Sequence, residues 1–356
     1  MRKISLPKLG WFKTKIKNVR DKSFLLLENV FIRIFEITPK LELFDQKILS
    51  FAPRGGRGIR KSNYDSEFFL SFPQDFRSSH VKLHFNSRFW IFDSIKVIFL
   101  VKFTKKVNVI LIQYIRGFHI FPSPRLLEFL KFSDVNIIKF WLDTWDENLW
   151  HKRILPASSI GGRNVLIDLP NNELTKLDKF GEYKWNPIPV INLPYVDFKA
   201  RKNFLFYSGA TSANGLYRER AEYISFLEEN NFSMSGVSYD WKNPVKRPSY
   251  DQYRKTLSNS QIALNFTWKG KVDVTTGRTW EIFSSGVLLL QNKSDILNSM
   301  FEPNLHFLEF TSKSHLLNLL HELADDLERV EQISKAGMDR YNSLFDSSKF
   351  WREHLY

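Results

Sequence analysis

The feature that most constrains the fold is a regular alternation of short apolar runs and amphipathic segments along most of the chain. Residues 107–114 form a continuous run rich in β-branched side chains, as a strand buried in a parallel sheet requires. Ser123 and Pro124 then have the residue types of a helix start, and residues 136–142 predict the next strand, followed by another at 164–167. Alternating strands and helices of these lengths predict βαβ units and an α/β fold with parallel sheets.

A second series of the same kind begins after a proline-containing segment, residues 183–203, that predicts a linker. Strands are expected at 204–207, 232–237, 261–267 and 287–291, with helices at 217–229 and 278–285, and Gly286 provides the left-handed residue that ends the second helix. One long amphipathic helix is expected beyond them, with an apolar stripe made of Leu316, Leu317, Leu320, Leu323 and Leu327.

The expected architecture is two Rossmann-like domains that face each other across a cleft. We expect a basic segment and helix over residues 1–45, with the helix at 24–45, and an acceptor domain over 46–195. A nucleotide-binding domain over 196–345 and an apolar tail over 346–356 that packs back on the body complete the chain.

The charge and the cysteine content limit the chemistry available to the chain and indicate where in the cell it works. The net charge is +14, with most of the excess in the first 60 residues, and the chain has no cysteine, which excludes disulfides and thiolate chemistry. Residues 11–20 interleave apolar and basic side chains, which fits either a segment on an anionic membrane surface or a solvated basic tail. No signal peptide or bilayer-spanning segment is expected, so the predicted location is the cytoplasm, with peripheral attachment to the inner face of the membrane.

The most informative stretch runs from residue 265 to residue 290: a strand end, a polar loop, a helix start and a second strand. The loop supplies hydroxyls and backbone N–H groups beside a helix N-terminus, which attracts anions. Arg278 and Lys271 add positive charge that suits a diphosphate, and Glu281 can accept two hydrogen bonds from a ribose diol. Two structural alternatives remain: Glu281 compensates the helix dipole, or Arg278 is solvated or paired with Glu281.

Residues 260–267 (SQIALNFT) and 277–289 (GRTWEIFSSGVLL) resemble the GT-B glycosyltransferases of the group 1 type, closest to the CgeB-like, or spore maturation protein-like, branch. The resemblance covers residues 200–345, whereas the N-terminal half matches only in layout. It implies a metal-independent enzyme that moves a sugar from a nucleotide-diphosphate donor to a glycan, lipid-linked or protein acceptor. No cofactor is implied beyond the nucleotide-sugar co-substrate.

The resemblance also implies roles for single residues. Glu281 would hold the ribose, and Arg278 and Lys271 the diphosphate. Thr276 and Gly277 would offer the helix N-terminus to the phosphates.

Three further positions extend this implied donor site. The turn at Gly209, with Arg218 or Arg220 from the following helix, would face the same cleft. Asp273 stands eight residues before Glu281, where the family has the first glutamate of its E-x7-E pair. The shorter side chain leaves open which group binds the hydroxyls of the donor sugar.

A general base is needed only if the reaction inverts the sugar carbon. Asp143 is the first candidate and His119 the second, since both lie just past predicted strands of the first domain, and Asp146 is the third. Structural alternatives are a helix N-cap for Asp143 and a hydrogen-bonded loop residue for His119. The eight histidines have no metal-ligand spacing, so no metal site is expected.

Two rival functions remain open from the sequence. One is a catalytically inactive protein that keeps the fold for binding or structure. The other is nucleic-acid binding by the basic front end, which the absence of a recognisable nucleic-acid motif disfavours.

Overall fold

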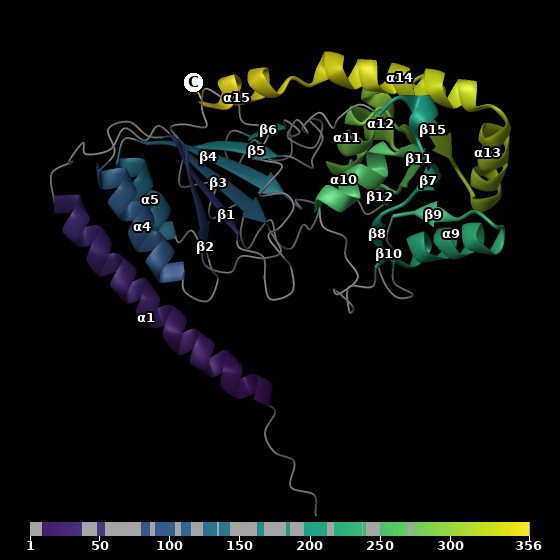
Figure 1. Cartoon of the computed structure of the whole chain (residues 1–356). Helices are drawn as coiled ribbons and strands as arrows, with labels where there is room; N and C mark the ends of the chain where they lie inside the picture. Colours follow the sequence, from purple (N-terminus) through teal and green to yellow (C-terminus); the bar gives the residue numbers. More distant parts are fainter. Residues whose placement is uncertain are drawn as a thin grey trace, which may run out of the picture.

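A computed structural model of the chain describes most of its regular elements. The residues it describes are 9–37, 48–53, 80–85, 90–103, 108–114, 124–133, 135–142, 162–166, 183–185, 196–211, 217–236, 238–239, 250–269, 273–275 and 277–355. The elements group into two α/β halves, each built on a parallel sheet (Figure 1). The α/β fold predicted from the alternating pattern is thereby confirmed.

Among the described residues of the N-terminal half, six parallel strands form a sheet in the spatial order β2-β1-β3-β4-β5-β6. The strands are β1 (Ile48–Pro53), β2 (His80–Phe85), β3 (Asn108–Tyr114), β4 (Asn136–Leu142), β5 (Arg163–Leu166) and β6 (Tyr183–Trp185). Strands β3 and β4 are the most apolar of the sheet by sequence, as their position inside it requires.

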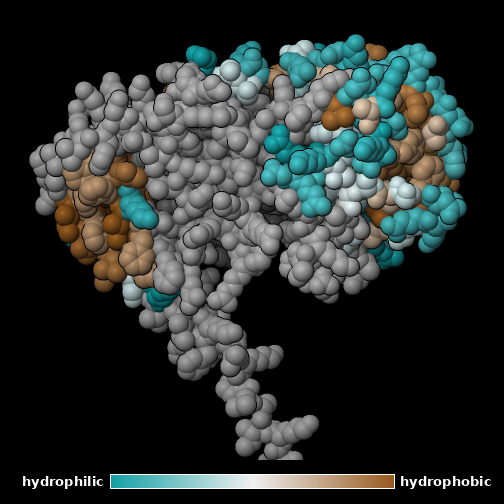
Figure 2. Space-filling model, viewed as in Figure 1, coloured by the Kyte–Doolittle hydropathy of each residue, from teal (hydrophilic) through white to brown (hydrophobic). Residues whose placement is uncertain are grey.

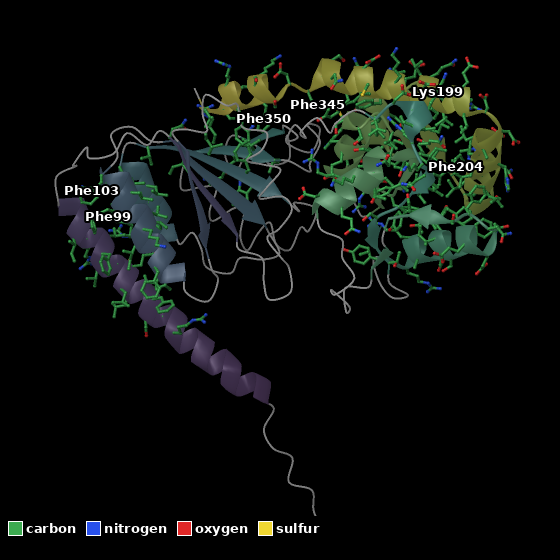
Figure 3. The ribbon with its side chains drawn as sticks, in the orientation of Figure 1. Phe99, Phe103, Lys199, Phe204, Phe345 and Phe350 are labelled. Carbon is green, nitrogen blue, oxygen red and sulfur yellow. The ribbon has the colours of Figure 1, made fainter. Side chains whose placement is uncertain are left out.

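Three helices, α1 (Leu9–Ile37), α4 (Trp90–Phe103) and α5 (Pro124–Phe132), share one core with this sheet. Ile32, Val97, Leu130 and Ile137 are buried there, each contributing about 1.5–3 kcal/mol by leaving water. Apolar side chains also gather on the outer surface over α1 and α4 (Figure 2). Phe99 lies close to α1 (Figure 3).

The C-terminal half contains a parallel sheet of five strands in the order β15-β14-β11-β7-β9. Its strands are β7 (Asn203–Phe206), β9 (Met234–Ser235), β11 (Ser260–Asn265), β14 (Leu288–Asn292) and β15 (Leu308–Phe310). Two short pairs accompany it: β8 (Gly209–Ala210) with β10 (Ser238–Tyr239), and β12 (Trp268–Lys269) with β13 (Asp273–Val274). The helices are α9 (Arg218–Glu229), α10 (Tyr250–Ser258), α11 (Gly277–Ser284), α12 (Asp295–Met300), α13 (Lys313–Asp325), α14 (Leu327–Leu344) and α15 (Ser347–Leu355).

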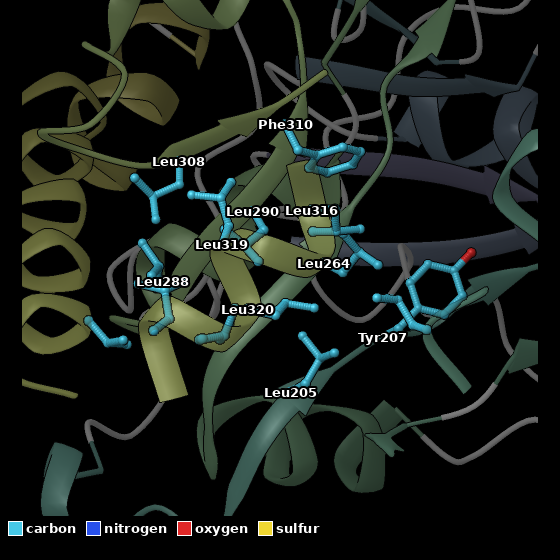
Figure 4. Packing of buried hydrophobic residues seen from close by; sticks show 14 of the residues in the cluster. Leu205, Tyr207, Leu264, Leu288, Leu290, Leu308, Phe310, Leu316, Leu319 and Leu320 are labelled. Carbon is cyan, nitrogen blue, oxygen red and sulfur yellow. The ribbon is translucent and has the colours of Figure 1, made fainter. Parts of the chain in front are cut away.

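Leucines from the central strands form the core of this half against α13 (Figure 4). Leu264 and Leu290 of the sheet and Leu316 and Leu320 of the helix are completely buried. Burial on both faces of the sheet explains the apolar runs at 262–264 in β11 and 288–290 in β14.

Arg201 joins the segments that lead into β11 and β14. Its guanidinium is buried and donates hydrogen bonds to the carbonyl oxygens of Ser260 (3.1 Å), Gly286 (2.6 Å) and Ser285 (3.3 Å). These carbonyls belong to the start of β11 and to the turn before β14, so one side chain joins both strand entries.

The last helix, α15, returns to the N-terminal sheet. Phe140 of β4 contacts the rings of Phe350 (5.9 Å between centroids) and Trp351 (5.7 Å), both buried. Arg163 of β5 donates to the carbonyl of Glu353 at 3.0 Å. Because side chains alternate along a strand, α15 covers the face of β4 opposite to the one that packs on α4 and α5.

Three details of the sequence-based layout were wrong. The segment 183–203 is not all linker, since it contains β6 and a 3-10 turn at Phe198–Ala200, and β6 is too short to show a period. The helix expected at 24–45 begins earlier, at Leu9, and the structure describes it up to Ile37, with residues 38–45 outside the described part of the chain. The long leucine helix is two helices, because Asp326 ends α13 and caps α14 by accepting from the N–H of Arg329 at 3.0 Å.

Candidate functional site

The strand order of the C-terminal sheet marks the place where a ligand is expected. Numbered by their order along the chain, the strands from β9 to β15 lie 2-1-3-4-5 across the sheet. The neighbours β7 and β11 are therefore the pair from which the following connections run to opposite sides, from β7 to β9 and from β11 to β14. Open α/β sheets bind ligands outside the carboxyl ends of the strands at such a switch point. The segments that follow those two ends are residues 207–209 and 266–267.

Gly209 and Arg278 meet at this point, although they are far apart in the sequence. A Cβ atom placed on Gly209 would lie 3.3 Å from Nη1 of Arg278 and 2.6 Å from the hydroxyl of Tyr207. Tyr207 is buried, so its ring cannot easily move aside. A side chain at 209 would therefore force Tyr207 to shift, and the bare backbone there lies beside a guanidinium, as a site for an anionic group needs.

Helix α11, which carries Arg278, is anchored to the sheet by its buried residues. Trp280, Ile282 and Phe283 pack into the core, and Gly286 closes the helix with a φ of 61°, as expected. The first residue, Gly277, and the buried Thr275 before it lie at the N-terminal end, where backbone N–H groups lack partners within the helix.

A buried polar triad fixes the first turn of α11 to the ends of two strands. The amide nitrogen of Asn265 donates to Oγ1 of Thr279 (3.0 Å) and to Oε1 of Gln291 (2.9 Å). The hydroxyl of Thr279 donates to the same oxygen of Gln291 at 3.1 Å, and all three residues are completely buried. The sequence contains one signal of this triad: Asn265 and Gln291 are polar residues that each end an apolar run.

The neighbouring strand ends are joined in a similar way. Oδ1 of Asn292 accepts from the backbone N–H of Thr267 at 2.7 Å and from its hydroxyl at 3.2 Å. The loop that follows β11 is thus held against the end of β14. Both arrangements make the candidate site rigid at its base.

Glu281 lies one turn after Arg278 and is half-buried. Its Oε2 accepts a hydrogen bond from the hydroxyl of Tyr253 in α10, at 2.5 Å. Tyr253 in turn packs against Phe206 at the end of β7, with ring centroids 5.7 Å apart. The carboxylate is therefore oriented by a neighbouring helix, and the tyrosine is a residue that sequence reasoning missed.

The two arginines of α9 occupy different positions. Arg218 is an exposed residue paired with Glu222 at 2.9 Å, and the pKa of Glu222 is lowered by hydrogen bonds from Arg218 and Lys313. Arg220 instead donates to the carbonyl of Phe266 at 3.2 Å, directly after β11. Of the pair, Arg220 is the one that contacts the segment after β11, whereas the role of Arg218 stays a prediction.

Several predicted site residues lie outside the described residues: Asp143, His119, Asp146, Lys271 and Thr276. Asp273 lies in β13, where the backbone pairs with Lys269 of β12. Their proposed roles stay predictions. Among the described residues there is no group of three or more His, Asp or Glu side chains that could hold a metal ion.

Known proteins resemble the chain in sequence over its C-terminal part and in fold over most of its length. A protein family described as "Glycosyl transferase-like" matches residues 218–355, which include α9, the polar triad, Arg278 and Glu281. No curated protein sequence matches the chain.

Solved structures resemble nearly the whole chain at low sequence identity. HepE from Anabaena, solved in complex with UDP-glucose, has a TM-score of 0.53 and 10% identity over 86% of this chain and 98% of its own. Sucrose-phosphate synthase from Thermosynechococcus elongatus has a TM-score of 0.54 and 11% identity over 87% and 96%. The chain therefore has the two-domain GT-B fold, with a glycosyltransferase-like sequence in its C-terminal half.

Proposed function

We propose that the protein is a glycosyltransferase that takes a sugar from a nucleoside-diphosphate donor bound to its C-terminal half. The observation that carries this proposal is the meeting of Arg278 with the bare backbone of Gly209 at the switch point of the sheet. The glycosyltransferase-like sequence match and the UDP-glucose complex of the similar HepE structure support the same class of ligand.

In this proposal the chemistry divides among a few groups. Arg278 and the N-terminus of α11 bind the diphosphate and stabilise the negative charge that develops on it as its bond to the sugar breaks. Glu281, oriented by Tyr253, accepts hydrogen bonds from the ribose. Lys271 and Thr276 would add to the diphosphate site, and Asp273 to the recognition of the donor sugar.

Positive side chains and helix N–H groups can stabilise a leaving diphosphate without a divalent cation, so we propose metal-independent transfer. The acceptor is proposed to be a glycan, a lipid-linked saccharide or a protein bound by the N-terminal half. If the sugar carbon is inverted, Asp143 is the proposed base, with His119 as the second choice. We also propose that the protein works in the cytoplasm and that it is related to the CgeB-like branch through the run 277–289.

The experiment that tests the donor site is calorimetric titration with UDP and GDP. Arg278→Gln should weaken binding by about 10- to 100-fold, because a hydrogen bond to a charged group contributes about 1.5–3 kcal/mol. Arg329→Gln, which removes an arginine paired with Glu322 at 3.5 Å in a helix outside the site, is the matched control. Equal UDP and GDP affinities in Arg278→Gln and wild type would contradict the proposed diphosphate site.

Activity needs a separate measurement, because a binding protein with this fold would pass the first test. Glu281→Ala should abolish donor hydrolysis and transfer while the thermal unfolding temperature stays near that of the wild type. Tight UDP binding without turnover of any nucleotide sugar by the wild type would favour the catalytically inactive alternative.

A further inference from the structure

One part of the described surface is far more apolar than the rest. Six large hydrophobic residues of α1 and α4 are exposed by 44–67%: Leu26, Leu27, Val30, Ile34, Phe92 and Phe99. They are six of the nine exposed large hydrophobics among the described residues, and Figure 2 shows the brown patch that they contribute to. We name this surface the α1–α4 face. Apolar patches of this kind mark sites of interaction.

The core of the domain does not need these side chains. The opposite side of α1, with Ile32 and Glu28 fully buried and Phe35 half-buried, packs against α4 and α5. Phe35 contacts the ring of Phe99 edge-on at 6.4 Å, so the two helices meet at the margin of the α1–α4 face. A helix that is apolar on both sides has a second surface to cover.

Cations surround the apolar residues. Every charged side chain that the structure describes as exposed or half-exposed on the two helices is basic: Arg20, Lys22, Arg33, Lys96 and Lys102. In the sequence, Lys13, Lys15 and Lys17 precede them, interleaved with Phe12 and Ile16 at helical spacing. The sequence of the two helices also contains four acidic residues, namely Asp21, Glu28, Glu36 and Asp93, so the basic residues outnumber them. Apolar side chains flanked by lysine and arginine are the composition of helices that lie in a membrane interface.

We propose that the α1–α4 face docks on an anionic lipid bilayer, with α1 lying in the plane of the interface. Its cations attract acidic headgroups while Leu26, Val30 and Phe92 enter the region between headgroups and acyl chains. None of the described helices is long and apolar enough to cross a membrane. A symmetric dimer through this face would bring its own cations against each other, which disfavours a second copy as the occupant.

This inference names the surface of attachment, and it does not depend on sugar transfer. It predicts that the full chain binds vesicles of phosphatidylcholine and phosphatidylglycerol (7:3) much more strongly than vesicles of phosphatidylcholine alone. Cosedimentation at low salt measures the partition coefficient. A chain lacking residues 1–22 should retain part of the binding, because most of the α1–α4 face remains.

Two sets of substitutions separate the apolar and the charged contributions. Leu26→Gln, Val30→Gln and Phe92→Gln together should reduce binding to the anionic vesicles about tenfold or more. Arg33→Gln with Lys96→Gln should reduce it by about fivefold for each cation removed at low salt, and the loss should shrink as salt is added. Leu305→Gln with Leu344→Gln, which change exposed leucines of the C-terminal half, is the matched control and should bind as the wild type does.

The outcomes are distinct. Equal vesicle binding by the triple variant and the wild type would overturn the proposal, as would a wild type that does not bind anionic vesicles. Sedimentation that shows a dimer in the wild type and a monomer in the triple variant, without vesicle binding, would make the face a contact between copies and would also overturn it. UDP titration of the same proteins reports folding, and its failure in the wild type would count against the donor site while leaving the vesicle result intact.

Discussion

Replacing Lys139 by methionine is expected to stabilise the N-terminal half at neutral pH. Lys139 lies in β4, paired in register with Leu111 of β3 and Asn164 of β5, and the residue is fully buried. Burial lowers the pKa of Lys139 from 10.5 to about 8, because the ammonium form loses its hydration. A lysine in this position therefore costs stability whenever it carries a proton.

The size of the effect follows from the two pKa values. Below pH 8 the lysine is protonated in both the folded and the unfolded chain, so the folded state bears the full cost of the buried charge. The difference between 10.5 and 8, at about 1.36 kcal/mol for each pH unit, corresponds to about 3 kcal/mol. Between pH 8 and 10.5 the folded chain releases the proton first, so wild-type stability rises until the cost has disappeared. Methionine fills a similar space without a charge.

Urea unfolding monitored by tryptophan fluorescence at pH 7 and at pH 10 measures the difference. We expect Lys139→Met to be more stable than the wild type by up to about 3 kcal/mol at pH 7, with most of that gain absent at pH 10. Lys96→Met, at an exposed position of α4, should change stability by about 0.5 kcal/mol or less. A variant that is no more stable than the wild type at pH 7, or a gain that does not depend on pH, would refute the reasoning.

Three further substitutions test the C-terminal half. Tyr253→Phe should raise the Kd for UDP by roughly fivefold, about 1 kcal/mol, because Glu281 loses its 2.5 Å hydrogen bond from Tyr253. Tyr223→Phe, which changes a core tyrosine, is the control, and equal UDP affinities in the wild type and Tyr253→Phe would contradict the positioning role of Tyr253. Gly209→Ala should lower the free energy of unfolding in urea by about 1–3 kcal/mol and weaken UDP binding, because the added Cβ would lie 2.6 Å from the buried Tyr207 hydroxyl. An unchanged urea midpoint would contradict this prediction and show that the turn relaxes. Arg201→Met should cost about 3 kcal/mol or more in urea unfolding, because buried carbonyls at both strand entries lose their donor, whereas Arg329→Met should be nearly neutral.

Sequence patterns predicted the buried parts of the fold well. The strand expected at 136–142 is β4, and Gly286 has the left-handed conformation that was expected after its helix. Both follow from local rules, because a strand covered on both faces is mostly apolar and a glycine readily takes the left-handed conformation that ends a helix. Strand β2 (His80–Phe85) was not predicted, although its residues alternate strictly between polar and apolar, as in a half-buried strand at the edge of a sheet.

The candidate site was only partly predictable. Arg278 and Glu281 stand together on one short helix, so local spacing indicated them. Tyr253 lies 28 residues before Glu281, and Asn265 lies 26 residues before Gln291, so their contacts exist only after the sheet has formed. The same reason explains why the sequence could not choose between Arg218 and Arg220, because only the folded chain brings Arg220 to the carbonyl of Phe266.

The position of α15 has a consequence for how the chain folds during synthesis. Arg163 of β5 and the carbonyl of Glu353 that it contacts are 190 residues apart, so one face of β4 is covered by a helix made after the whole second sheet. Until that helix leaves the ribosome, Phe140 has no aromatic rings from α15 against it. The first half of the protein to be translated thus completes its fold after the second, and the nascent chain carries uncovered apolar surface for most of that interval.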